Sequence, residues 1–445
     1  MTRRVAILGA AGRDYHDFNT FFRGNEDFEV VAFLQIRGQN VGELDEFPER
    51  TYPSSLAGEG YDEGIPILPA DRMEEVVEEE EVDEIVLSYS DVSHEDVMHQ
   101  ASRALSLGCG FRLIGPGDMQ LESEKPVIAV DAVRTGCGKS QASRKIADIL
   151  QEEGVEVVVV REPMPYGDLE DSRVQRFETM EDIDEAGVTI EEREEYEQHV
   201  ERGHVVYAGV DYEEILERAE GEAEVVLWEG GNNELPFFQP DLHFVLADPH
   251  RPGHEVRYHP GEANLRTADY AIINKENTAE QGGIDRVVEN VEKLNPGAEI
   301  VHADSEVTVE NPDAIEGKKA VVVEDGPTVT HGGTKSGAGL IAAEKYGASE
   351  VVDPRDYVSG TLKKVMEEYE LKDVIPAMGY SQGQVEELEE ALRRAEADVV
   401  VSGTPHDLSR LLDVGKPVVR AQYRIEERNV TFREILGSHP GISGL

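Results

Sequence analysis

The sequence has few cysteines and no long hydrophobic run. Two cysteines, Cys109 and Cys137, are too few for a disulfide framework in 445 residues. No apolar stretch approaches the roughly 18 residues that cross a membrane. The N-terminal stretch RRVAILGAAG is followed at once by Arg13 and Asp14, which makes it too short and too polar for a signal peptide. These absences predict a cytoplasmic protein without a membrane partner.

Basic residues are also scarce, with 42 Lys and Arg against 93 Asp and Glu and a net charge of -51. This balance excludes a general affinity for nucleic acid, whose phosphates need Lys and Arg partners. Hydrophobic residues still make up 39% of the chain, so it is not a disordered acidic segment. The acidic surface and the low lysine count, 13 against 29 arginines, fit a halophile whose salt screens self-repulsion.

The length and the alternation of strands and helices predict an α/β fold of three units with mostly parallel sheets. We expect a Rossmann-like domain over residues 1–122, a P-loop NTPase domain over 123–317 and a C-terminal α/β domain over 318–445. In the first domain the strand Val5–Leu8 runs into the turn Gly9–Asp14. That turn is either a weak anion site or a tight βα turn without a ligand, and no acidic residue is placed for a dinucleotide.

The strongest local signal runs from Val127 to Leu150. An apolar strand, Val127–Asp131, leads into the turn TGCGKS, residues 135–140, and then into a helix with apolar residues at helical spacing. Strand, glycine-rich turn, GKS and helix together predict a phosphate-binding loop. The standard spacing has glycine at position 133, where this chain has Val133.

Residue types in and around this loop predict a nucleotide site. Lys139 is placed to reach the β- and γ-phosphates, and the Ser140 hydroxyl is placed to hold Mg²⁺. A second loop, Asn274-Lys275-Glu276-Asn277, resembles the N-K-x-D base-reading loop of GTPases but lacks its Asp, so ATP and GTP both stay open. The predicted nucleotide-binding residues are Arg134, Thr135, Gly136, Cys137, Gly138, Lys139, Ser140, Gln141, Asn274 and Lys275.

Other candidates follow the strands of the same domain. Glu229 ends an apolar strand and is followed by two glycines, as expected of a residue that holds Mg²⁺ directly or through water, or acts as a base. Arg161 ends another strand and is either a phosphate contact or a surface arginine. The predicted catalytic residues are Lys139, Glu229 and Arg161, and the predicted metal ligands are Ser140 and Glu229.

Polar loops further along predict a site for a small anionic, phosphorylated metabolite. Arginines are favoured because a planar guanidinium matches phosphate. The loop before residue 340 is rich in Gly and Thr and opens a helix, so it is either a second anion site or a flexible connection. The predicted substrate-binding residues are Arg161, Tyr166, Arg251, His254, Arg266, His331 and Lys335.

Seven stretches together resemble the archaeal cyclic 2,3-diphosphoglycerate synthetase family, whose relatives are also described as predicted GTPases. The stretches are GAAGRDYHDFN (9–19), SYSDVSHE (88–95), AVRTGCGKSQ (132–141), REPMPYGDL (161–169), EGGNNE (229–234), DPHRPGHE (248–255) and VEDGPTVTHG (323–332). The resemblance covers nearly the whole chain and implies a haloarchaeal-type member.

This resemblance implies an ATP- or GTP-dependent synthetase that uses Mg²⁺, with K⁺ as a further candidate cofactor. The γ-phosphoryl group would activate one phosphate of 2,3-diphosphoglycerate, and the other phosphate would close an intramolecular anhydride. Related proteins with this loop variant imply a homodimer. The alternatives are another small anionic substrate, a slow regulatory nucleotide switch, or an assembly protein that uses nucleotide to fix its shape.

Overall fold

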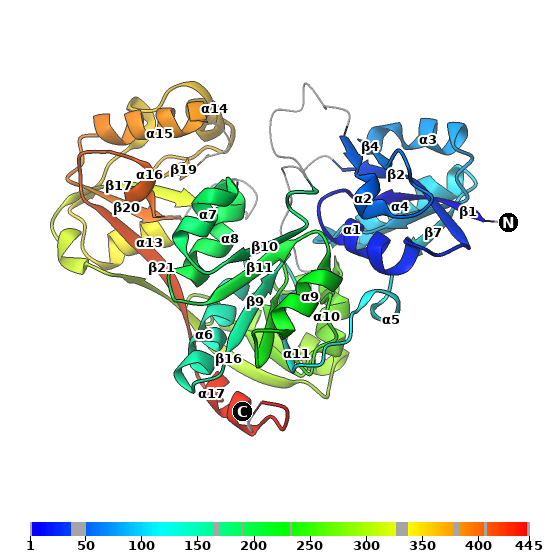
Figure 1. The fold of residues 1–445 in the computed structure, drawn as a ribbon. Coiled ribbons are helices and arrows are strands. Elements are labelled where there is room, and N and C mark those ends of the chain that lie inside the picture. The colour runs from blue at the N-terminus through cyan, green and yellow to red at the C-terminus, as the bar shows by residue number, and fades with distance from the viewer. Residues whose placement is uncertain are drawn as a thin grey trace. The chain divides into compact units, whose positions relative to one another are not determined.

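The chain folds into two compact units in the computed structural model, and the predicted α/β class is confirmed. The first unit holds Met1–Val188, His199–Ala303 and Glu427–Leu445, and the second holds Thr189–Gln198 and Asp304–Glu426 (Figure 1). The predicted three-domain division stays a prediction. The structure describes residues 2–36, 50–162, 169–188, 190–231, 234–325, 337–377, 382–404 and 407–442.

The N-terminal part of the first unit is a six-stranded sheet in the order β3-β4-β2-β1-β5-β7. Its strands run parallel except β3, which pairs antiparallel with β4. The strands are β1 (Arg3–Leu8), β2 (Phe28–Gln35), β3 (Arg50–Tyr52), β4 (Ile65–Pro69), β5 (Glu84–Leu87) and β7 (Gly110–Leu113). The helical segments are α1 (Arg13–Asp17), η1 (Phe18–Phe22), α2 (Ser54–Ala57), η2 (Ala70–Arg72), α3 (Met73–Glu79), α4 (His94–Ser106) and α5 (Pro116–Met119).

A second sheet of the same unit runs in the order β10-β11-β9-β12-β8-β13-β15-β16. All neighbours are parallel except β10 and β11, and β8, β12 and β13 are buried along their whole length, as parallel strands covered on both faces are. The strands are β8 (Val127–Ala132), β9 (Val157–Arg161), β10 (Val174–Phe177), β11 (Val205–Gly209), β12 (Val225–Glu229), β13 (Leu242–Ala247), β15 (Tyr270–Ile273) and β16 (Glu299–Val309).

Helices of this part connect the strands, and a short ribbon ties it to the N-terminal part. The ribbon pairs β6 (Val92–Ser93) with β14 (Tyr258–His259) in antiparallel register. The helical segments are α6 (Lys139–Glu152), α7 (Met180–Ala186), α9 (Tyr212–Glu220), η3 (His254–Val256), α10 (Gly261–Thr267), α11 (Gln281–Leu294) and α17 (Phe432–Ser438).

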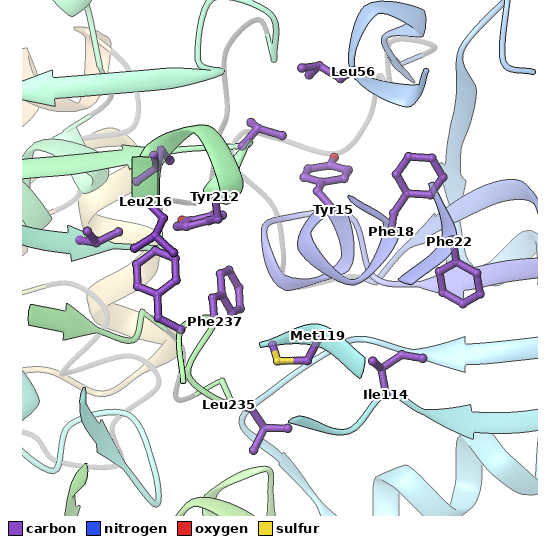
Figure 2. Close-up of a cluster of buried hydrophobic side chains, with 14 of the residues drawn as sticks. Tyr15, Phe18, Phe22, Leu56, Ile114, Met119, Tyr212, Leu216, Leu235 and Phe237 are labelled. Carbon is purple, nitrogen blue, oxygen red and sulfur yellow. The ribbon is translucent and has the colours of Figure 1, made fainter. Parts of the chain in front are cut away.

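One hydrophobic core joins the two parts of the first unit. Figure 2 shows Tyr15 and Met119 of the N-terminal part packed in the same cluster as Tyr212 and Phe237 of the second sheet's region. The ring of His16 stacks on Phe237 with centroids 3.9 Å apart. Burial lowers the pKa of His16 to about 3, so this ring is neutral and packs as an aromatic. The core fixes the loop after β1 against the region of the phosphate loop.

The second unit is a smaller parallel sheet in the order β21-β20-β17-β18, with β19 also paired to β17. Its core is formed by apolar residues of these strands and of the flanking helices. The elements are α8 (Ile190–Val200), whose last residues belong to the first unit, η4 (Pro312–Ala314), β17 (Lys319–Asp325), α13 (Ala338–Lys345), β18 (Glu350–Val351), η5 (Pro354–Asp356), α14 (Gly360–Glu368), β19 (Ile375–Ala377), α15 (Gln382–Arg394), β20 (Val399–Gly403), α16 (Leu408–Leu411) and β21 (Val418–Glu427).

Two sequence-based expectations need correction. The apolar sequence of residues 298–302 predicts the last strand of the middle domain, but this strand continues to Val309 because buried and partly buried residues keep alternating along it. The charged sequence of residues 189–204 predicts a solvated helix or a lid, but Tyr196, Glu197 and His199 are buried. Within the described segments no helix is long and apolar enough to cross a membrane.

Candidate functional site

The strand–turn–helix predicted from the sequence is formed by β8 and α6. Gly136 and Gly138 have φ of 82° and 105°, in the left-handed region that side chains disfavour. A Cβ added to Gly138 would lie 2.3 Å from Asn274 Nδ2, so the loop has no space for a side chain there. The two glycines therefore give this turn the left-handed backbone that a phosphate loop uses, with Asn274 packed against it.

Val133, which stands where a standard loop has glycine, is a packed core residue. It is 2% exposed, and its backbone N–H donates to Leu246 O at 2.9 Å. Gly261 packs so closely that a Cβ on it would lie 2.2 Å from Val133 O. The loop thus begins after position 133, and the glycine that allows a close approach is supplied by α10.

Three side chains hold successive carbonyl groups of the loop. Arg251 Nη2 donates to Thr135 O at 2.9 Å, Lys275 Nζ to Gly136 O at 2.6 Å, and Asn274 Nδ2 to Cys137 O at 2.9 Å. Asp248 accepts from both cations, at 3.1 Å from Arg251 and 2.9 Å from Lys275. Burial raises the pKa of Asp248, but the two cations outweigh it and keep this pKa below its usual value. The predicted residues Asn274, Lys275 and Arg251 are thus brought to the loop, where they fix its backbone.

The loop lysine bridges to the turn that follows β12. Lys139 Nζ donates to Gly231 O at 2.7 Å. Gly231 belongs to the Glu229-Gly230-Gly231 turn, so the lysine and this turn lie at one end of the neighbouring strands β8 and β12. Ligands of open parallel sheets bind at this carboxyl end of the strands.

Arg134 connects the loop to the N-terminal part. Its Nε donates to Asp91 Oδ1 at 2.6 Å, its Nη1 lies 3.3 Å from His254 Nδ1, and its guanidinium lies 3.8 Å above the Tyr258 ring. Burial, then the nearby Arg134 charge, lowers the pKa of His254, so this imidazole is neutral and accepts from Arg134. The predicted residues Arg134 and His254 are therefore adjacent at the mouth of the loop.

Arg161 and Glu229 form a buried ion pair that also includes His199. Arg161 Nη1 contacts Glu229 Oε1, and His199 Nε2 lies 2.9 Å from Glu229 Oε2. The exposed fractions of Arg161, Glu229 and His199 are 2%, 0% and 1%. Burial raises the pKa of Glu229, but Arg161 and then His199 outweigh it and hold this pKa well below its usual range. Burial lowers the pKa of His199 to about 4.

This triad changes the expectation for two predicted catalytic residues. Arg161 faces a carboxylate, and both oxygens of Glu229 already have cationic or imidazole partners. The structure does not present Glu229 as an open ligand beside Ser140, and its Mg²⁺ role stays a prediction. In the described segments no group of three or more His, Cys, Asp or Glu side chains is arranged to hold a metal ion. In P-loop NTPases the loop Ser or Thr and a carboxylate of a neighbouring strand hold Mg²⁺ together with the phosphates, so the Mg²⁺ role of Ser140 also stays a prediction.

Of the remaining predicted substrate residues the structure describes Arg266. Arg266 pairs with Glu262 on its own helix, at 2.6 Å. Tyr166, His331 and Lys335 lie outside the described residues. These four substrate roles stay predictions.

In the described part of the predicted second anion site, a carboxylate of the chain itself occupies the helix N-terminus. The backbone N–H groups of Gly337, Gly339 and Leu340 donate to the Glu324 carboxylate at 3.0, 3.2 and 2.8 Å. Because Glu324 already binds the start of α13, an anion at this helix end would have to replace it.

Sequence reasoning missed Glu162 and Glu234, two buried carboxyl groups beside the loop. Glu162 comes one residue after a buried strand and Glu234 comes five residues after one. A carboxylate at the end of a buried strand was also the signal that identified Glu229, so the same signal could have found them. Their contact depends on strand order, which the local pattern does not contain.

Comparison with known proteins identifies the family. The chain is 56% identical over 426 residues to arginine synthetase ArcE of Thermococcus kodakarensis, an alignment covering 96% of this chain and 94% of that one. The chain belongs to the ArcE family. No family model matches it.

Solved structures show only distant likeness to this ArcE-family chain. LpxK from Aquifex aeolicus in complex with ATP has a TM-score of 0.40 and 14% identity, with 75% of this chain and 91% of that one covered. A ParA family ATPase from Chlorobium tepidum has a TM-score of 0.24 and 15% identity, with 43% and 86% covered. The assignment of the α/β fold therefore rests on the strands and helices described above.

Proposed function

We propose that this chain is an ATP-dependent synthetase that forms arginine. The observation that carries the proposal is the 56% identity to arginine synthetase ArcE over nearly the whole of both chains. The geometry supports a nucleotide-dependent step, because the loop backbone, Lys139 and Ser140 stand where phosphates and Mg²⁺ are held in P-loop enzymes.

The chemistry of the product suggests the second substrate. Arginine ends in a guanidinium, and citrulline carries an oxygen where arginine carries one terminal nitrogen. Transfer of the ATP γ-phosphoryl group to this oxygen creates a phosphate leaving group, and ammonia then replaces it. Citrulline, ammonia and ATP thus give arginine, ADP and phosphate.

Such a reaction asks the protein mainly for positioning and charge neutralisation. Lys139 would neutralise the transferred phosphoryl group, and Ser140 would hold Mg²⁺. Arg251, Lys275 and Asn274 would keep the loop in its phosphate-binding shape through Thr135, Gly136 and Cys137, the contacts seen above.

The test is product formation. We expect the purified protein to release ADP and arginine from citrulline, ammonium chloride and MgATP, with both products in equal amounts. Lys139→Ala should lower turnover by at least about a hundredfold, because the lysine acts on transition-state charge. Its fold is checked by thermal unfolding followed through the fluorescence of Trp228, the single tryptophan of the chain.

The resemblance to cyclic 2,3-diphosphoglycerate synthetases supplies the competing substrate for the same assay. ADP release that depends on 2,3-diphosphoglycerate, with no arginine formed, would replace arginine synthesis by the cyclase reaction. Slow hydrolysis indifferent to both compounds would favour the nucleotide switch. The same assay with GTP in place of ATP tests which nucleotide is used, and the assay with K⁺ in place of Na⁺ tests the monovalent ion. Light scattering tests the predicted homodimer.

A further inference from the structure

Glu162 and Glu234 form a buried carboxyl pair after two neighbouring strands. Glu162 follows β9 and is 5% exposed, and Glu234 follows β12 and is 1% exposed. The two carboxyl groups are close enough to interact electrostatically. Burial, then the charge of Glu234, raises the pKa of Glu162 well above its usual value.

The pair lies beside the loop lysine. A Cβ added to Gly231 would be 3.0 Å from Glu162 Oε2, and Gly231 O accepts from Lys139 Nζ at 2.7 Å. Asp131, at the end of β8, interacts electrostatically with both Lys139 and Glu234. The carboxyl pair therefore adjoins the position where Lys139 would meet the transferred phosphoryl group.

The N-terminal part of the unit closes the other side of the pair. Ser90 Oγ donates to Glu234 Oε1 at 3.0 Å, and the backbone of Arg13 lies close to Glu162. Asp14 adds a further negative charge near Glu162, while its own carboxylate accepts from the backbone of Ala11 at 2.9 Å. The pair is thus enclosed by the loop after β1 and by the loop after β5.

Two oxygens here point to a ligand. Glu162 Oε2 and Asp131 Oδ1 have no hydrogen-bond partner in the part of the chain that the structure describes, although both residues are more than nine-tenths buried. Buried polar atoms of native proteins are nearly always bonded to protein, water or an ion, so these two oxygens are available to a bound hydrogen-bond donor. The carboxyl groups of Glu162, Glu234, Asp131 and Asp14 outnumber the nearby Lys139 cation, so the position favours a cation with N–H donors over an anion.

We propose that the Glu162–Glu234 pair binds the ammonium ion that supplies the new nitrogen and accepts its proton beside the phosphoryl-transfer site. The inference rests on the proposed function and names the residues that handle its nitrogen substrate. The loop after β1, which sequence alone left between an anion site and a plain turn, would then serve to enclose this cation site.

The proton balance of the step closes within the site. Ammonium gives one proton to a carboxylate of the pair and becomes ammonia with a free lone pair. That lone pair forms the C–N bond as the C–O bond to phosphate breaks, and the bonding electrons leave with the phosphate oxygen. The new C–NH3⁺ group gives a second proton to the departing phosphate, and the pair gives its own proton to another phosphate oxygen. Arginine and dihydrogen phosphate result, and the pair returns to its starting state.

The test compares Glu162→Gln and Glu234→Gln with Glu217→Gln, an exposed position on α9. Arginine formation is measured against ammonium chloride at saturating MgATP and citrulline. We expect kcat/KM for ammonium to fall by about a hundredfold or more in the first two variants, the range of a lost general base. Affinity for MgADP, measured by calorimetry, should stay within about twofold of wild type in all three variants. The pair lies beside Gly231, which accepts from Lys139, and not at the loop backbone that would hold the nucleotide phosphates.

The outcomes separate this inference from the proposed function. If the wild type forms arginine and both pair variants keep its kcat/KM for ammonium, the pair is not the nitrogen site. If the wild type forms no arginine, the cation site is tested by thermal unfolding. The melting temperature in ammonium chloride is compared with that in the same concentration of tetramethylammonium chloride. Stabilisation by ammonium that is lost in Glu162→Gln supports the cation site, and equal melting in both salts overturns it.

Discussion

Replacing Glu229 by Gln removes the only formal negative charge from the Arg161–Glu229–His199 triad while keeping its size. Arg161 is 2% exposed, so its guanidinium would stay buried without this carboxylate. Breaking such a buried pair costs about 3–5 kcal/mol because a buried charge loses its compensation. The unit that holds the triad has about 310 residues, and an unfolding entropy of about 2.1 cal/mol/K per residue converts each kcal/mol into about 1.5 °C. The melting temperature should therefore fall by about 5–8 °C.

Trp228 gives a local readout for this variant. It is fully buried and directly precedes Glu229, so its fluorescence follows the unit that contains the triad. Glu185→Gln, at an exposed position of α7, is the matched control and should melt like the wild type. If Glu229→Gln melted within about 2 °C of the wild type, the energetic reasoning on buried ion pairs would be refuted for this site.

Two further predictions concern the loop and the triad. Asn274→Asp replaces the donor to Cys137 O by an acceptor, so affinity for MgADP in calorimetry should fall by about 10–100-fold. Gln281→Glu, the same amide-to-carboxylate change at an exposed position at the start of α11, should leave this affinity unchanged. The pKa of His199 is lowered from 6.5 to about 4, so the unfolded state binds the extra proton between these values and stability falls as pH drops through this window. Between about pH 7 and pH 4.5 the free energy of unfolding, measured by denaturant titration, should therefore fall by about 2–3 kcal/mol less in His199→Gln than in the wild type. An equal fall in both proteins would contradict the low pKa of His199.

The phosphate loop was predictable because all its signals are local. Strand, glycines, GKS and helix occur within one continuous stretch, and each depends on near neighbours in sequence. Arg161 and Glu229 were also identified, since each ends a buried strand. Their contact with each other and with His199 was not, because it depends on β9 and β12 being neighbours and on where α8 ends.

The carboxyl pair shows the same limit of local reasoning. Glu162 and Glu234 are far apart in sequence, and each alone resembles an ordinary acidic residue in a chain that has 93 of them. In so acidic a sequence, composition hides the few carboxyl groups that are buried. Only the sheet order β9-β12-β8 brings them to the loop lysine.

The hydrophobic core shared by the two parts of the first unit has a consequence for how the molecule can be divided. Tyr15 and Met119 share that core with Tyr212 and Phe237. A shortened chain that began at residue 123 would expose the latter two rings to water and would be prone to aggregate. Residues 1–122 therefore cannot be removed or exchanged independently of the part of the unit that carries the phosphate loop.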